Sequence, residues 1–309
     1  MPTKILIDTD PGIDDSMAIL FALRSPELEV VGLTAVFGNT DVETTAQNAL
    51  RLIELEGHDE IPVAQGCGIP LVMPPRSHGK RVHGVDGLGE THMPPPRGKL
   101  LNIPAAQFIV ETILKYPGEI TLVPLGPLTN IALAVRLEPR IASMVRAVVI
   151  MGGSAGRGNA SPTAEANIFN DPESADIVFR AGWPLTMVGL DVTTKTIMTK
   201  EYLDELLSAG NKATEFIKRI LPFYQKWFRD YDGFSGAIPT HDPSAIACLL
   251  DRSLYRIERL PVHVETQGRG AGQTVADPRQ QWAGLPQIDV CLDVDVPRVL
   301  NLYRERMTR

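Results

Sequence analysis

This 309-residue chain has few cysteines and no excess of positive charge. Its three cysteines, Cys67, Cys248 and Cys291, stand far apart and not in the spacing of metal ligands. An odd number of isolated thiols argues against a disulfide framework and favours a reducing compartment, so we expect the protein in the cytoplasm. The net charge of −7 argues against a general nucleic-acid binder, because such proteins usually carry a basic face.

Membrane and targeting signals are also missing. The opening MPTKILIDTD enters an apolar run at once, without a basic-then-apolar leader, and no apolar run is long enough to span a membrane. We therefore expect no membrane and no nucleic acid among the partners. Low-complexity runs, internal repeats and a boundary linker are absent as well, which favours one domain over residues 1–309.

Short apolar runs alternate with helical patterns along the chain. The strands predicted from them are 4–7, 29–36, 120–125, 144–151 and 185–190, and the helices are 13–24, 43–56, 104–115, 128–137, 172–180 and 211–230. This alternation predicts an α/β fold with an open, mostly parallel sheet flanked by helices on both faces. Residues 66–98, rich in Gly, Pro and His, predict a long functional loop.

Polar and glycine-rich residues follow several of the predicted strands. Asp8 and Asp10 end the first strand, and residues 37–40, 125–127 and 151–153 end three others. In open parallel sheets the ligand binds beyond the carboxyl ends of the strands. We therefore expect the functional site at that edge of the sheet.

The segment DTDPGIDDS crowds four carboxylates, Asp8, Asp10, Asp14 and Asp15, around a Pro-Gly turn. The positive end of the following helix would stabilise each by only about 0.3–1 kcal/mol, which is too little to offset several converging anions. A bound hard cation such as Ca²⁺, which takes 6–8 oxygen ligands, would offset them. The alternative interpretation is an acidic helix cap on a solvated turn.

Two further segments carry residues of the same chemistry. His241 and Asp242 precede a proline and an apolar helix. Glu165, six residues after Asn159, would share one face with Asn167 if the backbone there is extended. Acidic and amide side chains accept and donate hydrogen bonds in fixed directions, so they are suited to reading sugar hydroxyls. Taken alone, each segment is equally a polar loop.

Together these motifs resemble the inosine-uridine-preferring nucleoside hydrolases. The blocks that carry the resemblance, in family order, are DTDPGIDDS, VFGNT, HGVDGLG, PLGPLTNIALA, MGG, AEANIFNDPE and HDPSA. The resemblance implies a Rossmann-like nucleoside hydrolase fold, with an additional C-terminal helical segment over the site. It also implies a homo-oligomeric enzyme, a dimer or tetramer, that cleaves the N-glycosidic bond of small-molecule ribonucleosides with water.

The resemblance also assigns roles to individual residues. Ca²⁺ would be held by the carboxylates of Asp10, Asp15 and Asp242 and the carbonyl of Leu125, and Asp10 would take the proton of the attacking water. His241 would protonate the leaving base, and His83 and Tyr231 are further candidates on the base side. The ribose would be bound by Asp14, Asn39, Met151, Asn159, Glu165, Asn167, His241 and Asp242.

One departure from the family and several alternatives remain open at this point. Ala166 stands where relatives often carry an aromatic residue, which affects contacts to the 5′-hydroxymethyl group or the base. Trp227, Tyr231 and Phe234 either wall the base pocket or belong to the core, so base contacts from 66–98 and 223–240 are not fixed. The competing functions are hydrolysis of another N-riboside such as nicotinamide riboside, non-catalytic nucleoside binding, and a phosphotransferase of the haloacid dehalogenase type.

Overall fold

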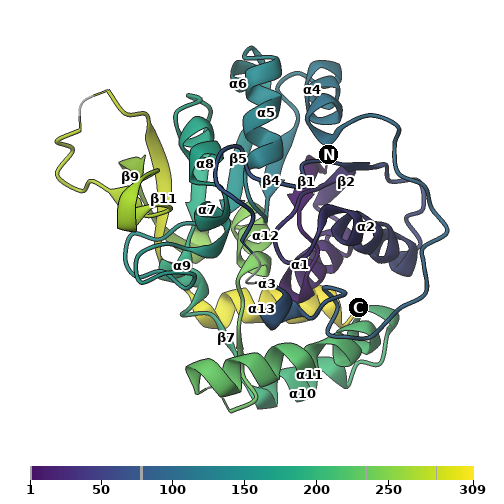
Figure 1. Cartoon of the computed structure of the whole chain (residues 1–309). Coiled ribbons are helices and arrows are strands. Elements are labelled where there is room, and N and C mark those ends of the chain that lie inside the picture. The colour runs from purple at the N-terminus through teal and green to yellow at the C-terminus, as the bar shows by residue number, and fades with distance from the viewer. Residues whose placement is uncertain (1, 77–78, 234, 283) are drawn as a thin grey trace.

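A central nine-stranded sheet organises the computed structural model, which describes residues 2–76, 79–233, 235–282 and 284–309 (Figure 1). The strand order is β10-β9-β11-β6-β5-β4-β1-β2-β3. All neighbours from β11 to β3 are parallel, whereas β9 runs antiparallel to both β11 and β10. The strands are β1 Thr3–Thr9, β2 Leu28–Ala35, β3 Val63–Gln65, β4 Thr121–Pro124, β5 Ala147–Met151, β6 Leu185–Val188, β9 Tyr255–Val264, β10 Thr274–Ala276 and β11 Gln287–Val294.

Helices cover both faces of the sheet, as the sequence predicts. The longer ones are α1 Ile13–Leu23, α2 Val42–Glu56, α4 Ala105–Lys115, α5 Thr129–Leu137, α8 Pro172–Phe179, α10 Lys200–Leu207, α11 Lys212–Asp232, α12 Asp242–Leu250 and α13 Val296–Met307. The short ones are α3 Gly79–His83, α6 Ile141–Met144, α7 Ala166–Asn170 and α9 Leu190–Thr193, with two 3-10 turns at Arg252–Leu254 and Gly268–Gly270. A separate two-stranded sheet pairs β7 Ile197–Met198 with β8 Ile238–Pro239.

Two hydrophobic clusters lie on opposite faces of the sheet. Ile5 and Ile7 of β1 belong to one cluster, together with α1, α2, α11, α12 and α13, and Leu6 belongs to the other, together with α4, α5 and α8. This division follows from the alternation of side chains along a strand. A strand covered on both faces needs a continuous apolar run, which explains the ILI of β1.

The α/β fold and the mostly parallel sheet are therefore confirmed, with differences in detail. The strand predicted from residue 144 begins only at Ala147, because Ile141–Met144 forms a short helix that buries Ile141. The strand predicted for 185–190 ends at Val188, and Leu190 already begins α9. The predicted loop 66–98 contains the short helix α3.

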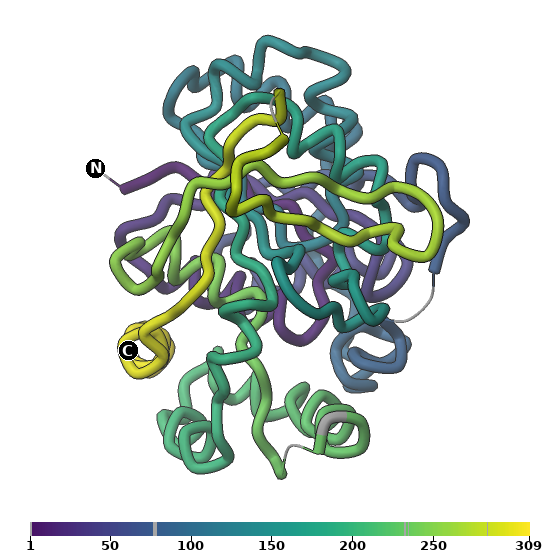
Figure 2. Tube along the Cα trace, turned by 90° about the vertical axis from the view of Figure 1, so that its left-hand side faces the viewer, coloured from purple at the N-terminus to yellow at the C-terminus, as the bar shows by residue number. Residues whose placement is uncertain are grey.

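The last third of the chain holds three strands that the periodic pattern missed. Strands β9, β10 and β11 form an antiparallel edge of the sheet, which lies at the left in Figure 1 and faces the viewer in Figure 2. The fold also brings Cys248 and Cys291 together, with their sulfur atoms 3.9 Å apart, although both thiols are free and buried. Within the described ranges, no helix is both long and apolar enough to cross a membrane.

Candidate active site

The turn between β1 and α1 builds the acidic half of the site. Asp15 lies in the first turn of α1, and its carboxylate accepts hydrogen bonds from the backbone N–H of Gly12 (3.1 Å) and of Asp10 (3.2 Å) and from the Thr9 hydroxyl (2.5 Å). Gly12 cannot be replaced without rearrangement, since a Cβ there would lie 2.6 Å from His83 Nδ1. The Pro-Gly turn therefore folds the carboxylates back over the end of the strand.

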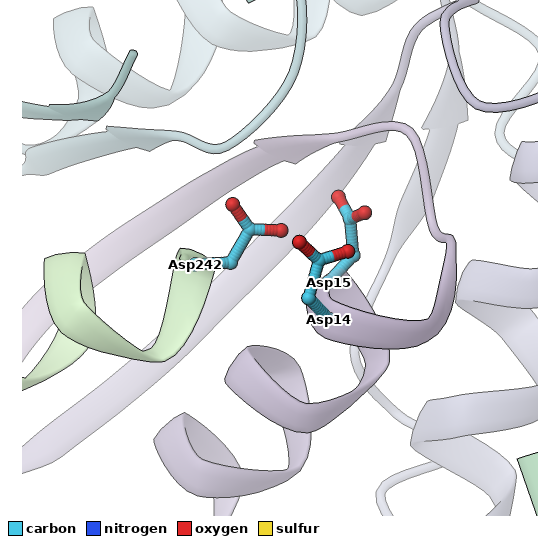
Figure 3. Close-up of side chains that lie close together, drawn as sticks. All are labelled: Asp14, Asp15 and Asp242. Carbon is cyan, nitrogen blue, oxygen red and sulfur yellow. The ribbon is translucent and has the colours of Figure 1, made fainter. Parts of the chain in front are cut away.

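Three of the aspartates converge closely enough to hold a metal ion. Ligand atoms of Asp14, Asp15 and Asp242 all lie within 4.8 Å of one another, and all three residues are buried. Asp14 and Asp15 come from the start of α1, whereas Asp242 comes from the start of α12 and faces them across the gap (Figure 3). The fold thus joins residues more than 220 positions apart.

Asp10 stands beside this cluster with one unsatisfied oxygen. Its Oδ2 accepts a hydrogen bond from the Asn39 backbone N–H at 2.7 Å, while its Oδ1 is buried and has no hydrogen-bond partner among the residues that the structure describes. Two glycines make room for the carboxylate, because a Cβ on Gly38 or Gly126 would lie 2.0 or 2.3 Å from its oxygens. A buried carboxylate oxygen without a hydrogen-bond partner is unfavourable, so we expect this oxygen to bind a ligand.

The electrostatics of the cluster favour a cation. Burial, followed by the charges of neighbouring aspartates, raises the pKa of Asp10 and of Asp242 well above the usual range. Burial likewise raises the pKa of Asp14 and of Asp15. Like charges that repel in a buried site need an opposite charge. Oxygen ligands of this kind fit a hard divalent cation such as Ca²⁺ or Mg²⁺.

The carbonyl of Leu125 lies at the end of β4, where the resemblance expects a metal ligand. It accepts a hydrogen bond of 2.6 Å from the side-chain amide of Asn167, which also donates to the carbonyl of buried Met151 at 3.1 Å. The structure therefore brings the predicted residues of β4, β5 and α7 into direct contact.

Glu165 and Asn159 line the same region from the segment before α7. The Glu165 carboxylate caps α7 by accepting hydrogen bonds from the backbone N–H groups of Asn167 and Ile168, and it also accepts one from the N–H of Gly153 beyond β5. Asn159 Oδ1 accepts from the Ala166 N–H at 2.9 Å. Glu165 is close enough for its charge to raise the pKa of Asp242, so this segment and the aspartate cluster form one electrostatic unit.

Asn39 bonds directly to the aspartates. Its side-chain amide donates to Asp15 Oδ2 at 2.9 Å and to the Asp10 carbonyl at 3.1 Å. Both amide hydrogens are thus engaged within the protein, and only the Oδ1 remains as an acceptor. Half-buried Ala166 lies between Glu165 and Asn167 on α7.

Both predicted histidines are buried next to the acidic cluster. His241 caps α12, with its Nδ1 2.9 Å from the Thr193 hydroxyl, and burial lowers its pKa while the charge of Asp14 opposes that shift. His83 accepts a hydrogen bond at Nδ1 from the Ile13 N–H at 3.1 Å. Burial lowers the pKa of His83 to about 4. His83 is therefore a buried side chain of the site and not a solvated loop residue.

Tyr224, which no sequence motif singled out, connects these groups. Its side chain is buried on one face of α11, its hydroxyl donates to Asp14 Oδ2 at 3.0 Å, and its ring centroid lies 5.3 Å from that of His83. The predicted helical segment 211–230 therefore reaches the site through this residue.

The aromatic candidates farther along α11 behave differently. Tyr231 is 65% exposed and stacks on Trp227, with ring centroids 3.7 Å apart. Tyr231 lies on the surface, whereas Trp227 is partly buried against the core. No described contact joins Tyr231 to the acidic cluster. Phe234, the third candidate, lies outside the described residues.

Comparisons with known proteins agree with the site. A family model described as "Inosine-uridine preferring nucleoside hydrolase" matches residues 5–301. The chain is 41% identical to uridine nucleosidase 1 of Arabidopsis thaliana, over 99% of this chain and 93% of the relative. It is 44% identical to the inosine-uridine preferring nucleoside hydrolase of Leishmania major, over 96% of this chain and 95% of the relative.

A solved structure shows the same fold. A plant nucleoside hydrolase, the PpNRh1 enzyme, superposes with a TM-score of 0.96 at 38% sequence identity. The match covers 100% of this chain and 99% of that one. Similarity therefore extends over the whole sheet and its helices, including the elements that carry the acidic cluster.

Proposed function

Because the chain belongs to the inosine-uridine preferring nucleoside hydrolase family and is a nucleoside hydrolase, we propose that it hydrolyses uridine and inosine with the help of a bound Ca²⁺ ion. The reaction breaks the N-glycosidic bond with water and gives ribose and the free base. Uridine is supported as a substrate by the uridine nucleosidase among the relatives.

One observation carries the metal-dependent chemistry. Asp14, Asp15 and Asp242 converge within 4.8 Å in a buried site, beside an Asp10 oxygen that has no partner. We infer that Asp10, Asp15 and Asp242 hold the cation together with the Leu125 carbonyl. When bound, such a cation polarises a water molecule and lowers its pKa.

Asp10 is the base that we assign to this water. Its unpartnered Oδ1 is the one carboxylate oxygen of that residue left free to accept a proton, because the Asn39 N–H occupies Oδ2. A carboxylate oxygen held next to a polarised water is suited to general-base catalysis. The geometry therefore supports proton transfer to Oδ1.

The remaining polar residues bind and activate the sugar. Asp14, Asn39, Asn159, Glu165 and Asn167 are assigned to the ribose hydroxyls. The sugar carries positive charge as the bond breaks, because glycoside cleavage passes through an oxocarbenium-like transition state. A pocket lined by fixed carboxylates stabilises that charge most strongly at the moment it develops.

His241 is assigned to the leaving base. Its ring is fixed by the Thr193 hydroxyl and by its position before Asp242, next to the sugar-binding carboxylates. Donation of a proton to the departing base would avoid a poor anionic leaving group. His83, held against the Ile13 N–H, is the second candidate for contact with the base.

A nucleoside panel tests the proposal. Release of reducing ribose is measured for uridine, inosine, 2′-deoxyuridine and nicotinamide riboside, each with Ca²⁺ and with excess chelator. We expect uridine and inosine to react, 2′-deoxyuridine to react at least about 100-fold more slowly through loss of a charge-assisted hydrogen bond, and chelator to stop the reaction.

Other outcomes of the panel would change the conclusion. If nicotinamide riboside alone were turned over rapidly, the substrate would be that N-riboside and not uridine or inosine. Full activity in excess chelator would show that the reaction does not require the cation. Binding of uridine without any ribose release would leave a nucleoside-binding protein on this fold.

A further inference from the structure

Two hydrogen bonds cross-link the turn 125–129 to the segment 167–171. The Asn167 amide donates to the Leu125 carbonyl at 2.6 Å, and the Thr129 hydroxyl donates to Asp171 Oδ2, also at 2.6 Å. Leu125 and Thr129 are four residues apart in the turn, and Asn167 and Asp171 are likewise four residues apart in the neighbouring segment. The turn is therefore held at its two ends by one neighbouring segment.

Asp171 is a rigid anchor for the second cross-link. It is fully buried, ends α7 and caps α8 by accepting a hydrogen bond from the Ser174 N–H at 3.1 Å. Its Oδ2 also accepts from the Leu71 N–H at 3.1 Å, which ties the long loop to the same carboxylate. A carboxylate bonded from three segments has little freedom to move.

The turn that Asp171 anchors lies against the proposed cation ligands. Leu125 presents its carbonyl there, and Gly126 approaches Asp10 so closely that a Cβ would lie 2.3 Å from the Asp10 Oδ1. A small displacement of this turn would therefore change the separation between the Leu125 carbonyl and the Asp10 carboxylate. Metal affinity depends steeply on how such outer contacts orient the ligands.

We propose that the Thr129–Asp171 hydrogen bond is a positioning device that sets the affinity of the cation site. Thr129 and Asp171 touch neither the substrate nor the reacting atoms in this assignment. They act by holding the turn, and through it the Leu125 carbonyl, at a fixed distance from Asp10. The inference rests on the proposed function, because it takes Leu125 and Asp10 as cation ligands.

The sharpest test compares three variants in calcium binding, measured by titration calorimetry on protein stripped with chelator. Thr129→Val keeps the shape of the side chain and removes only the hydroxyl. We expect its dissociation constant for Ca²⁺ to rise by about 10-fold or more, which is typical when an outer contact of a metal ligand is lost.

Two controls separate positioning from general damage. Thr129→Ser keeps the hydroxyl and should bind Ca²⁺ as tightly as the wild type. Ser174→Ala removes a different buried hydroxyl bond to Asp171, the 2.8 Å bond to its carbonyl, and should also bind normally. Melting temperatures in excess chelator show whether any variant is simply unfolded.

The results separate this inference from the proposed function. Wild-type calcium affinity in folded Thr129→Val would overturn the positioning role while leaving the proposed function intact. A wild-type protein that binds no Ca²⁺ would overturn both. If Thr129→Val does not fold, Thr129→Ala takes its place, because it also removes the hydroxyl, and normal affinity in that folded variant would equally overturn the inference.

Discussion

Single side chains in this site cannot easily replace one another, because most of their hydrogen-bonding atoms already have a partner within the protein. Asp15 accepts hydrogen bonds from Thr9, Gly12 and Asn39, whereas one oxygen of Asp10 has no hydrogen-bond partner among the described residues. Such differences within one cluster distinguish a residue that holds the site together from one that can accept a proton. The predictions at this scale concern Asp10 and His241.

Replacing Asp10 by Asn should lower kcat by roughly 10²–10⁴-fold, because it removes a base and one anionic ligand while keeping the shape of the side chain. The measurement is ribose release from uridine at saturating Ca²⁺. Asp41→Asn is the matched control, since Asp41 is an exposed helix cap near the same edge and asparagine also caps helices. A near-normal rate for Asp10→Asn would require a different base.

Replacing His241 by Ala should slow the hydrolysis of uridine and inosine by about 10²–10⁴-fold, which is the range of general acid catalysis. A riboside with a nitrophenolate leaving group, which departs without a proton, should be barely affected. Both substrates are compared at saturating Ca²⁺ because His241 adjoins Asp242. Equal slowing of both substrates would reassign His241 to sugar positioning, and His83 would become the next candidate.

At the scale of elements, the site lies where helix N-termini and strand ends come together. Helices α1 and α12 both begin at the acidic cluster, and α11 supplies Tyr224 from outside the sheet. The helix ends favour the carboxylates by only about 0.3–1 kcal/mol each. The Tyr224 hydroxyl is therefore a significant additional partner for Asp14.

Replacing Tyr224 by Phe should reduce kcat/KM by about 10- to 100-fold, because a hydrogen bond to a charged group is worth about 1.5–3 kcal/mol. The reduction should be the same for uridine and inosine, since Asp14 is assigned to the ribose. Tyr303→Phe is the matched control, because Tyr303 is equally buried but its hydroxyl has no hydrogen-bond partner in the described part of the chain. Equal activity of the two variants would contradict a role for the Tyr224 hydroxyl.

At the scale of the whole molecule, the cation site connects both ends of the chain. Asp14 and Asp15 lie near the start of the sequence and Asp242 lies near its end, so a cation between them would bridge α1 and α12. Without a cation, these buried carboxylates repel one another. Removal of the ion should therefore weaken the fold as well as the activity.

We expect Ca²⁺ at 100 times its dissociation constant to stabilise the folded protein by about 2.7 kcal/mol. The melting temperature, followed by circular dichroism, should accordingly be several degrees higher in Ca²⁺ than in chelator. In the Asp242→Asn variant this difference should be much smaller. A melting temperature that is independent of Ca²⁺ in the wild type would argue against a structural cation.

The sequence by itself determined the class of fold and the chemistry of the site. Continuous apolar strands such as ILI can lie only inside a covered parallel sheet, and the carboxylates of DTDPGIDDS must then emerge at its edge. These are local properties, fixed by period, turn residues and charge. The same reasoning placed the strand ends that carry Asn39, Leu125 and Met151.

Only the tertiary structure decided which distant residues meet. The contact of Tyr224 with Asp14 and the anchoring of Thr129 by Asp171 have no local signal, because each joins elements through packing across the molecule. The antiparallel edge of β9, β10 and β11 was missed for a related reason, since strand pairing depends on non-local hydrogen bonds. His83 likewise lies within a glycine-rich loop in the sequence, and the fold alone buried it against Ile13.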